Sequence, residues 1–317
     1  MKGVRLYYAT DVHGSETCFK KFLNAGKLYK ADVIIMGGDI TGKTVTPIFE
    51  SNNGYRCRLL GETVHAQGEK ALRELEEKIR SIGSYPMVTD EEEYKIFQEN
   101  GEKRLALFES IITANLRRWV EMADERLSST DIECYISPGN DDIPAIDKVL
   151  EKAERIVNPN EKIVMVKGRH EMLSLGYSNI TPWMCPRDVT EETLRDKLNR
   201  LAVEVQNPKL SIYNIHVPPY GTGLDEAPEL DEQLRPKLEP GKGVKTKPVG
   251  SQAVRESLAN QQPLLGLHGH IHESRGFARI GRTLCLNPGS EYQEGVLKGA
   301  LIQVSEDRIR DFLFTTG

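Results

Sequence analysis

Short apolar runs alternate with helical patterns along most of the chain, and several runs end at glycine beside a polar side chain. Residues 4–9 and 31–36 are rich in β-branched and aromatic side chains, which is typical of buried strands. Between them, apolar residues recur at helical spacing from Phe19 to Leu23, after the potential N-terminal cap Ser15. This strand–helix–strand order predicts an α/β fold.

The second half of the chain continues the pattern. Further strands are predicted over 132–136, 162–167, 171–175, 209–215 and 263–267. Residues 223–249 are rich in Pro, Gly and charge, and they predict a long mobile loop. The C-terminal segments predict a run of antiparallel strands over 276–280, 283–286, 299–304 and 308–314.

Residues 42–130 interrupt this alternation. Two strand-like segments flank Ser51-Asn52-Asn53-Gly54, a hairpin turn signal, and two helical stripes follow. We therefore predict one domain over 1–317 that is interrupted by a hairpin and a helical cap over 42–130. The insertion could be a lid that shapes a substrate pocket, a helix pair packed on one edge, or a homodimer contact, and the pattern leaves these open.

Composition narrows the classes of function. The net charge of −5 gives no global footprint for nucleic acid or for an anionic membrane. No apolar run approaches the roughly 18 residues of a membrane span, and the N-terminus resembles a first strand more than a signal peptide. The five cysteines are widely spaced without a C-x-x-C pair, which favours reduced thiols that pack in a cytoplasmic protein.

Candidate chemistry gathers where the predicted strands end. His268, His270 and His272 lie within five residues of one another, in a chain of only seven histidines. Ligands collect at the C-terminal ends of strands in open α/β sheets. Seven nitrogen and oxygen donors at five such ends suit a pair of divalent cations, with Asp39 able to bridge the two. These donors are Asp11, His13, Asp39, Asn140, His216, His270 and His272.

These residues carry a resemblance. The blocks Asp11-x-His13, Gly38-Asp39, Gly139-Asn140, His216 and Gly269-His270-x-His272 are similar, in order, to the motifs of the calcineurin-like metallophosphoesterase superfamily. Longer phrases look like its Icc-like bacterial and archaeal branch. They are 216–222 (His-Val-Pro-Pro-Tyr-Gly-Thr), 269–273 (Gly-His-Ile-His-Glu), 287–290 (Asn-Pro-Gly-Ser), 181–183 (Thr-Pro-Trp) and Pro186-Arg187.

The resemblance implies a four-layer αββα sandwich of two packed mixed β-sheets flanked by helices. It also implies two divalent transition-metal ions, from Mn, Fe, Zn or Co, that share a water and align it for attack on phosphorus. The first ion would be held by Asp11, His13, Asp39 and His272, and the second by Asp39, Asn140, His216 and His270. The implied activity is that of a phosphodiesterase or a small phosphomonoesterase, with Asn140 also contacting substrate.

One position departs from the superfamily pattern. Asp141 stands where the superfamily usually has the His that protonates the leaving group. An Asp near two cations should be ionised and is a poor general acid, so no catalytic acid is assigned. His170 is a weak substitute, and Arg169 or Lys43 could bind phosphate. The alternation of His268 with His270 turns it toward a hydrogen bond behind the metal ligands.

The sequence leaves three classes of function open. We expect a hydrolase of a small phosphoester, and an acid-poor site favours a diester or an activated ester. The alternative is a non-catalytic metal-binding scaffold on the same fold, which would have no need of all seven donors. A nuclease is disfavoured by the acidic balance and the lack of an aromatic and basic stripe. We expect no nucleic-acid or membrane partner, and a homodimer through 42–130 is possible.

Overall fold

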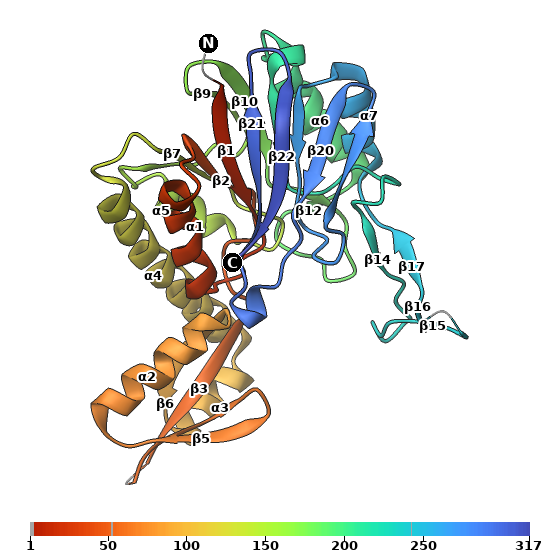
Figure 1. Cartoon of the computed structure of the whole chain (residues 1–317). Helices are drawn as coiled ribbons and strands as arrows, with labels where there is room; N and C mark the ends of the chain where they lie inside the picture. The colour runs from red at the N-terminus through yellow and green to blue at the C-terminus, as the bar shows by residue number, and fades with distance from the viewer. Residues whose placement is uncertain (1–2, 52, 242) are drawn as a thin grey trace.

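Two six-stranded sheets lie face to face and helices cover their outer faces (Figure 1). This computed structural model describes residues 3–51, 53–241 and 243–317. In spatial order the first sheet is β22 (Ile309–Thr316), β21 (Lys298–Val304), β1 (Val4–Ala9), β2 (Val33–Met36), β7 (Glu133–Ile136) and β8 (Ile156–Val157). The second is β19 (Gly276–Ile280), β20 (Thr283–Asn287), β18 (Leu265–Leu267), β13 (Ile212–Ile215), β10 (His170–Leu175) and β9 (Lys162–Val166).

Alternation along the strands explains the layers. In β1, Leu6 and Tyr8 are buried between the two sheets, whereas Tyr7 and Ala9 face the helical layer. Successive side chains of a strand point to opposite faces, so a strand buried on both faces is apolar throughout. The helices over the first sheet are α1 (Glu16–Leu28), α4 (Gly101–Leu127) and α5 (Asp147–Leu150). Those over the second are α6 (Glu191–Ala202) and α7 (Gln252–Gln261). The four-layer αββα sandwich is therefore confirmed.

Parallel strands in both sheets direct their C-terminal ends to one edge of the sandwich. Strands β1, β2, β7 and β8 are parallel in the first sheet, and β10, β13, β18 and β20 are parallel in the second. The four predicted C-terminal strands are confirmed and pair antiparallel, but they divide between the two sheets. The β19–β20 hairpin joins the second sheet and the β21–β22 hairpin joins the first.

The insertion is a small α/β unit rather than a hairpin with a helical cap. It contains β3 (Thr44–Ser51), β4 (Gly54–Leu59), β5 (Glu62–Ala66), α2 (Gly68–Ser81), β6 (Ser84–Thr89) and α3 (Glu91–Glu99). The four strands form one sheet in the order β5-β4-β3-β6, with a core of its own. The predicted hairpin is β3–β4, and its turn residue Asn52 lies outside the described residues.

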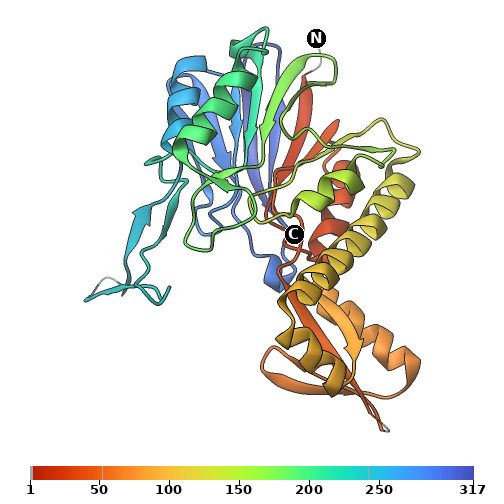
Figure 2. The ribbon, with the colours of Figure 1, turned by 180° about the vertical axis from the view of Figure 1, so that it is seen from behind.

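The second half of α4 ties the insertion to the main domain. The Trp119 ring stacks on Phe19 of α1 with their centroids 4.2 Å apart, and both side chains are buried. The remainder of the insertion extends away from the two sheets (Figures 1 and 2).

Residues 223–249, predicted as a long mobile loop, contain two short antiparallel strand pairs among their described residues and form an arm. Its pairs are β14 (Glu226–Pro228) with β17 (Thr246–Pro248), and β15 (Leu238–Glu239) with β16 (Gly243–Val244). Lys237 and Lys245 each lie 2.7 Å from a carboxylate oxygen of Glu229 and bridge the arm. In the part of the chain that the structure describes, no helix has both the length and the apolar character to span a membrane.

Candidate active site

The seven predicted donors all follow strands that end at the shared edge of the sandwich. Asp11 and His13 come after β1, Asp39 after β2 and Asn140 after β7; His216 comes after β13, and His270 and His272 after β18. The structure thus brings together residues from both sheets and from segments up to 261 positions apart in the sequence, as for Asp11 and His272.

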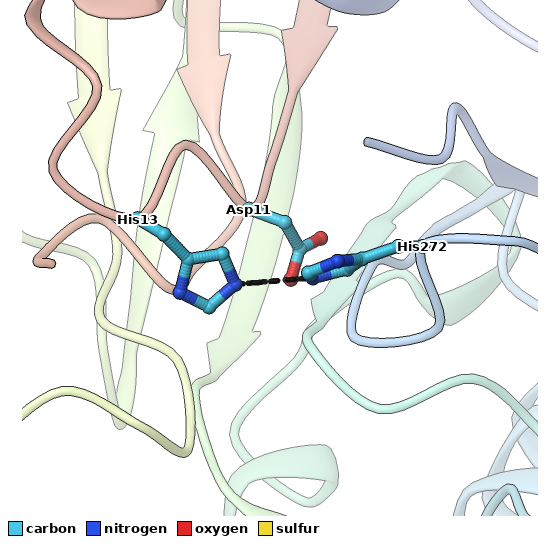
Figure 3. Close-up of side chains that lie close together, drawn as sticks. All are labelled: Asp11, His13 and His272. Atoms are coloured by element: carbon cyan, nitrogen blue, oxygen red, sulfur yellow. Dashed lines mark hydrogen bonds and ion pairs between the residues drawn. The ribbon is translucent and has the colours of Figure 1, made fainter. Parts of the chain in front are cut away.

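Asp11, His13 and His272 form the first group of candidate metal ligands (Figure 3). The Nε2 atoms of the two histidines are 3.0 Å apart, and Nε2 of His272 is 3.4 Å from Oδ1 of Asp11. Oδ2 of Asp39 lies 3.6 Å from Nε2 of His13. Two imidazole nitrogens and carboxylate oxygens directed at one point are a donor set that suits a divalent transition metal.

Asp39, His216 and His270 form the second group. Oδ1 of Asp39 lies 3.4 Å from Nε2 of His216, whereas its other oxygen faces His13 of the first group. One carboxylate therefore lies between two donor groups, which is the arrangement that a bridging ligand needs.

Two buried side-chain atoms among the candidate ligands have no hydrogen-bond partner: Oδ1 of Asn140 and Nε2 of His216. Buried polar atoms are nearly always bonded, so each of these needs a partner. In His216, Nδ1 lies 3.2 Å from the carbonyl of Gly37 and donates to it, which directs the Nε2 lone pair at the cluster. The residues therefore fit a bound cation.

The backbone is strained at the candidate ligands. Asp11, His13, Asp39 and His270 adopt φ angles of 53°, 39°, 49° and 68°, in the left-handed region that few non-glycine residues occupy. Such strain persists only where surrounding contacts impose it, and it clusters at functional sites. Four of the seven candidate ligands share it, which separates this edge from ordinary turns.

Two glycines let the loops approach the carboxylates. A Cβ atom on Gly139 would lie 2.1 Å from Oδ1 of Asp39, and one on Gly269 would lie 2.4 Å from Oδ2 of Asp11. Both distances are shorter than any van der Waals contact, so only glycine fits at either position.

The protonation of the histidines reflects the concentrated negative charge. Burial alone would lower the pKa of His216, yet the Asp39 and Asp11 carboxylates raise it to about 9. Burial and the nearby charge on His216 together lower the pKa of His270 to about 3. Burial also raises the pKa of Asp39, to about 7. His216 thus keeps its proton at neutral pH, and its positive charge stabilises the nearby carboxylates as a bound cation would.

Further side chains hold these loops in place. Asp142 accepts hydrogen bonds from the backbone N–H groups of Ile40, Thr41 and Gly139 at 2.8–3.0 Å, and so joins the ends of β2 and β7. The segment 287–290 (Asn-Pro-Gly-Ser) holds the loop after β18 and also contacts the loop after β1. Nδ2 of Asn287 donates to the carbonyl of Ile271 at 2.9 Å. The Ser290 hydroxyl donates to the carbonyl of Asp11 at 2.6 Å.

Asp141, at the superfamily's usual His position, forms an ion pair with Lys43 and accepts a hydrogen bond from the Cys185 thiol at 2.7 Å. Burial would raise the pKa of Asp141, but the Lys43 ammonium and the thiol hold it well below its usual range. Burial, with the adjacent carboxylate, raises the pKa of Cys185 to about 12, so the thiol stays a donor. All five cysteines are free, as predicted, and the Cys185 thiol also contributes a hydrogen bond at the site.

The predictions for His170 and Arg169 were wrong in their placement. His170 begins β10, whereas Leu175 at the other end of that strand accepts a hydrogen bond from His216 N–H at 2.9 Å. Five residues of strand separate the two ends by about 16 Å. Nδ1 of His170 lies 2.9 Å from the carbonyl of Leu210, and Arg169 lies in the turn before it. Both residues therefore lie at the opposite end of the sheet from the candidate ligands.

His268 turns away from the candidate ligands, as predicted. The cause is not strand alternation, because β18 ends at Leu267 and so does not extend from His268 to His270. It is fully buried, and its Nδ1 lies 2.8 Å from the carbonyl of Ile215, the residue before His216. Burial lowers the pKa of His268 to about 4, so it is neutral and supports the His216 strand end by a main-chain contact.

Sequence reasoning missed three residues at the site. The Tyr292 ring packs against His13 and His272, with centroids 4.8 and 5.9 Å away. Ser178 and Asp188 contact His270 and Asn140 by hydrogen bonds of 3.3 and 2.9 Å. None of the three belongs to a donor pattern, and only the tertiary fold brings them to the site.

Comparison with known proteins supports the fold. The protein TT1561 of Thermus thermophilus superposes with a TM-score of 0.57 at 12% identity, over 100% of this chain and 99% of that chain. This likeness shows a shared fold, and the resemblance to the calcineurin-like metallophosphoesterase superfamily comes from the order of the motif blocks. An archaeal phosphodiesterase gives a TM-score of only 0.34 at 10% identity, over 99% of this chain and 100% of that chain, too low to support an argument.

Sequence comparison is less informative about activity. No known family profile matches the chain. An uncharacterised protein of Methanocaldococcus jannaschii, MJ1162, is 28% identical over 172 residues, which are 53% of this chain and 70% of that protein. The superfamily resemblance therefore rests on the motif residues and on the fold that brings them together.

Proposed function

We propose that this chain is a dinuclear-metal phosphoester hydrolase. The observation that carries the proposal is the position of Asp39, whose two carboxylate oxygens face two separate histidine-containing groups. Two divalent cations bound there would lower the pKa of a shared water and neutralise phosphoryl oxygens. Asp11, His13, Asp39 and His272 would hold the first, and Asp39, Asn140, His216 and His270 the second.

The chain's own residues would orient the ester. Oδ1 of Asn140 is buried without a hydrogen-bond partner, and its Nδ2 donates to Asp188, so the amide is fixed with its oxygen toward the ligands. Lys43 is half-exposed beside Asp141 and keeps a positive charge at the edge of the site. A phosphoryl oxygen can approach that ammonium from solvent.

The pair of Lys43 and Asp141 also bears on the kind of ester. Asp141 is ionised and has no proton to give, so it cannot act as the general acid. A leaving group that is stable as an anion needs no such proton. We therefore propose a diester or an activated small ester as substrate, rather than an ester with a strongly basic leaving group.

The test is hydrolysis of bis-p-nitrophenyl phosphate by the purified chain with Mn²⁺, beside His216→Ala and His270→Ala variants. We expect turnover by the natural chain and its loss in both variants, because each loses a donor of the second group. Equal rates in all three proteins would contradict the proposal. Bound Mn²⁺ without turnover on any phosphoester would favour the non-catalytic scaffold.

A further inference from the structure

A loop beside the candidate metal ligands exposes three large apolar side chains. It spans residues 180–187, between β11 (Ser178–Asn179) and β12 (Asp188–Val189). The exposed fractions of Ile180, Trp183 and Met184 are 59%, 63% and 81%. Single exposed apolar residues are common, but three within five residues at a candidate active site indicate a binding surface.

Both ends of the 180–187 loop are fixed to the site. Before the loop, the Ser178 hydroxyl lies 3.3 Å from Nε2 of His270. After it, Oδ1 of Asp188 accepts from Nδ2 of Asn140 at 2.9 Å, and the N–H of Arg187 donates to the Asn140 carbonyl at 3.0 Å. The loop therefore contacts a histidine and an asparagine of the second donor group.

The loop is also held from within. Oδ2 of Asp188 accepts from the N–H of Thr181 at 3.0 Å and from the N–H of Cys185 at 2.9 Å. Met184 adopts φ 51° in a turn closed by its N–H to the Thr181 carbonyl, a conformation that is costly for this side chain. Contacts this numerous give the exposed side chains fixed backbone positions, which favours binding over random exposure.

The loop lies close enough to hold part of a bound ester. The Cys185 thiol donates to Asp141, and Trp183 is only two residues from Cys185. Two residues span at most about 7 Å. A group attached to a phosphate at the metal ligands is thus within reach of the indole.

We propose that Trp183 and Met184 bind a flat aromatic ring in the organic part of the ester. An indole stacks on flat rings, and a thioether also makes favourable contacts with them. An alkyl group would gain no stacking. The ring could be an aryl group or a nucleobase, since both offer the same flat face. This inference rests on the proposed function, because the donor groups and Lys43 would hold the phosphate.

Tryptophan fluorescence tests the inference without any turnover. The chain has two tryptophans, and Trp119 is buried against Phe19, so a ligand-dependent signal reports on Trp183. We expect phenyl phosphate or AMP to change the emission, glycerol 2-phosphate to leave it unchanged, and Trp183→Phe to abolish the response. The compound that gives the larger change in emission, phenyl phosphate or AMP, shows whether the ring is an aryl group or a nucleobase. No response to either ring, or an equal response to glycerol 2-phosphate, would overturn the inference.

Kinetics gives a second readout. Trp183→Ala should raise KM for phenyl phosphate about tenfold, as expected for a lost stacking contact, and Trp183→Phe should retain most of the affinity. Glycerol 2-phosphate has a strongly basic leaving group and serves as a competitor, and its inhibition constant should not change. Val203→Ala, an exposed apolar position at the end of α6, is the matched control. Equal effects on phenyl phosphate and on glycerol 2-phosphate would overturn the inference while leaving hydrolysis intact. Ring binding without any hydrolysis would refute the proposed function alone.

Discussion

Lys43 is the residue that most changes the picture of the site. It is paired with Asp141, the carboxylate at the position of the expected histidine, and half of its side chain remains exposed. The pair keeps a positive charge beside the candidate ligands without needing a proton transfer. Sequence reasoning named Lys43 only as one of several possible phosphate contacts, because its ionic partner lies 98 positions away.

Replacing Lys43 tests that role. Lys43→Met should raise KM for bis-p-nitrophenyl phosphate by roughly 10-fold or more, since hydrogen bonds to charged groups contribute about 1.5–3 kcal/mol. The unpaired Asp141 carboxylate would also repel the phosphate. Steady-state kinetics beside Lys43→Arg and the α1 surface variant Lys20→Met would measure this. An unchanged KM in Lys43→Met would show that the ammonium does not contact substrate.

Gly139 gives a prediction about packing at the ligands. Gly139→Ala should weaken Mn²⁺ binding at least tenfold, because its methyl group would displace the Asp39 carboxylate. Calorimetric titration measures the affinity. Gly101→Ala is the control, since a methyl group there meets no other atom within 4 Å. Equal affinities in both variants would mean that Asp39 does not have to keep this position.

His216 makes the metal-free protein sensitive to pH. Its pKa is raised to about 9 in the folded chain, against about 6.5 in the unfolded chain. Its contribution is therefore complete below about pH 6.5 and is lost as the pH rises through about 9, a change of about 3 kcal/mol. Urea unfolding of EDTA-treated protein should show this fall in the free energy of unfolding.

The control for this experiment is His216→Asn, which keeps an N–H donor near the Gly37 carbonyl but cannot titrate. Its stability should fall less over the same range. Asp39, with its pKa raised to about 7, acts in the same direction and leaves a residual slope. A natural chain whose stability is constant or rises between about pH 6.5 and 9 would contradict the account.

At the scale of elements, strands buried on both faces were predictable because their sequences are apolar throughout. In the insertion, the β3–β4 hairpin was predicted from its turn signal, but β5 and β6 were not. Strand β6 contains Pro86, which argues against a central strand, but β6 lies at the edge of its sheet, where proline is tolerated. The strands of the 223–249 arm have two or three residues and are too short for any periodicity, and Glu229 with its two lysines supports them instead.

The candidate ligands were predictable for a similar local reason. Each ligand lies shortly after a strand and close to glycine or proline, and the spacing between the ligands matches short sequence motifs. Asp142 and Asp188 could not be found this way. Asp142 accepts from backbone groups on another loop, and Asp188 accepts from the Asn140 side chain and from backbone groups of the 180–187 loop. The misplacement of His170 has the same origin. A residue at a strand junction can lie at either end of a sheet, and only the strand direction decides which.

The role of the 42–130 insertion, as a lid, a packed helix pair or a dimer contact, concerns the whole molecule. Its root contacts the site, since the Ser15 hydroxyl donates to the carbonyl of Ser81 at 2.7 Å and Gly83 approaches Tyr292. Its outer part extends away from the sheets (Figure 2). Because the outer part extends away from the sheets, the conformation described does not favour a lid. The outer surface of the insertion is free to contact another chain.

The predicted homodimer would use apolar side chains that this outer part exposes. Leu105 of α4 is 68% exposed and Ile96 of α3 is 54% exposed. Light scattering should find a dimer for the natural chain and a monomer for Leu105→Glu, because a buried unpaired charge is costly at an interface. Leu60→Glu, at an exposed turn of the same insertion, should remain dimeric. A monomeric natural chain would refute this interface.

We propose that seven side chains from two sheets form one hydrolytic site for two metal ions. The most direct test follows bis-p-nitrophenyl phosphate hydrolysis as Mn²⁺ is added to metal-free protein at a concentration well above the dissociation constants. The account predicts no turnover at the start and a rate that stops rising at two equivalents per chain. Full activity without metal, or no activity at saturation, would contradict it.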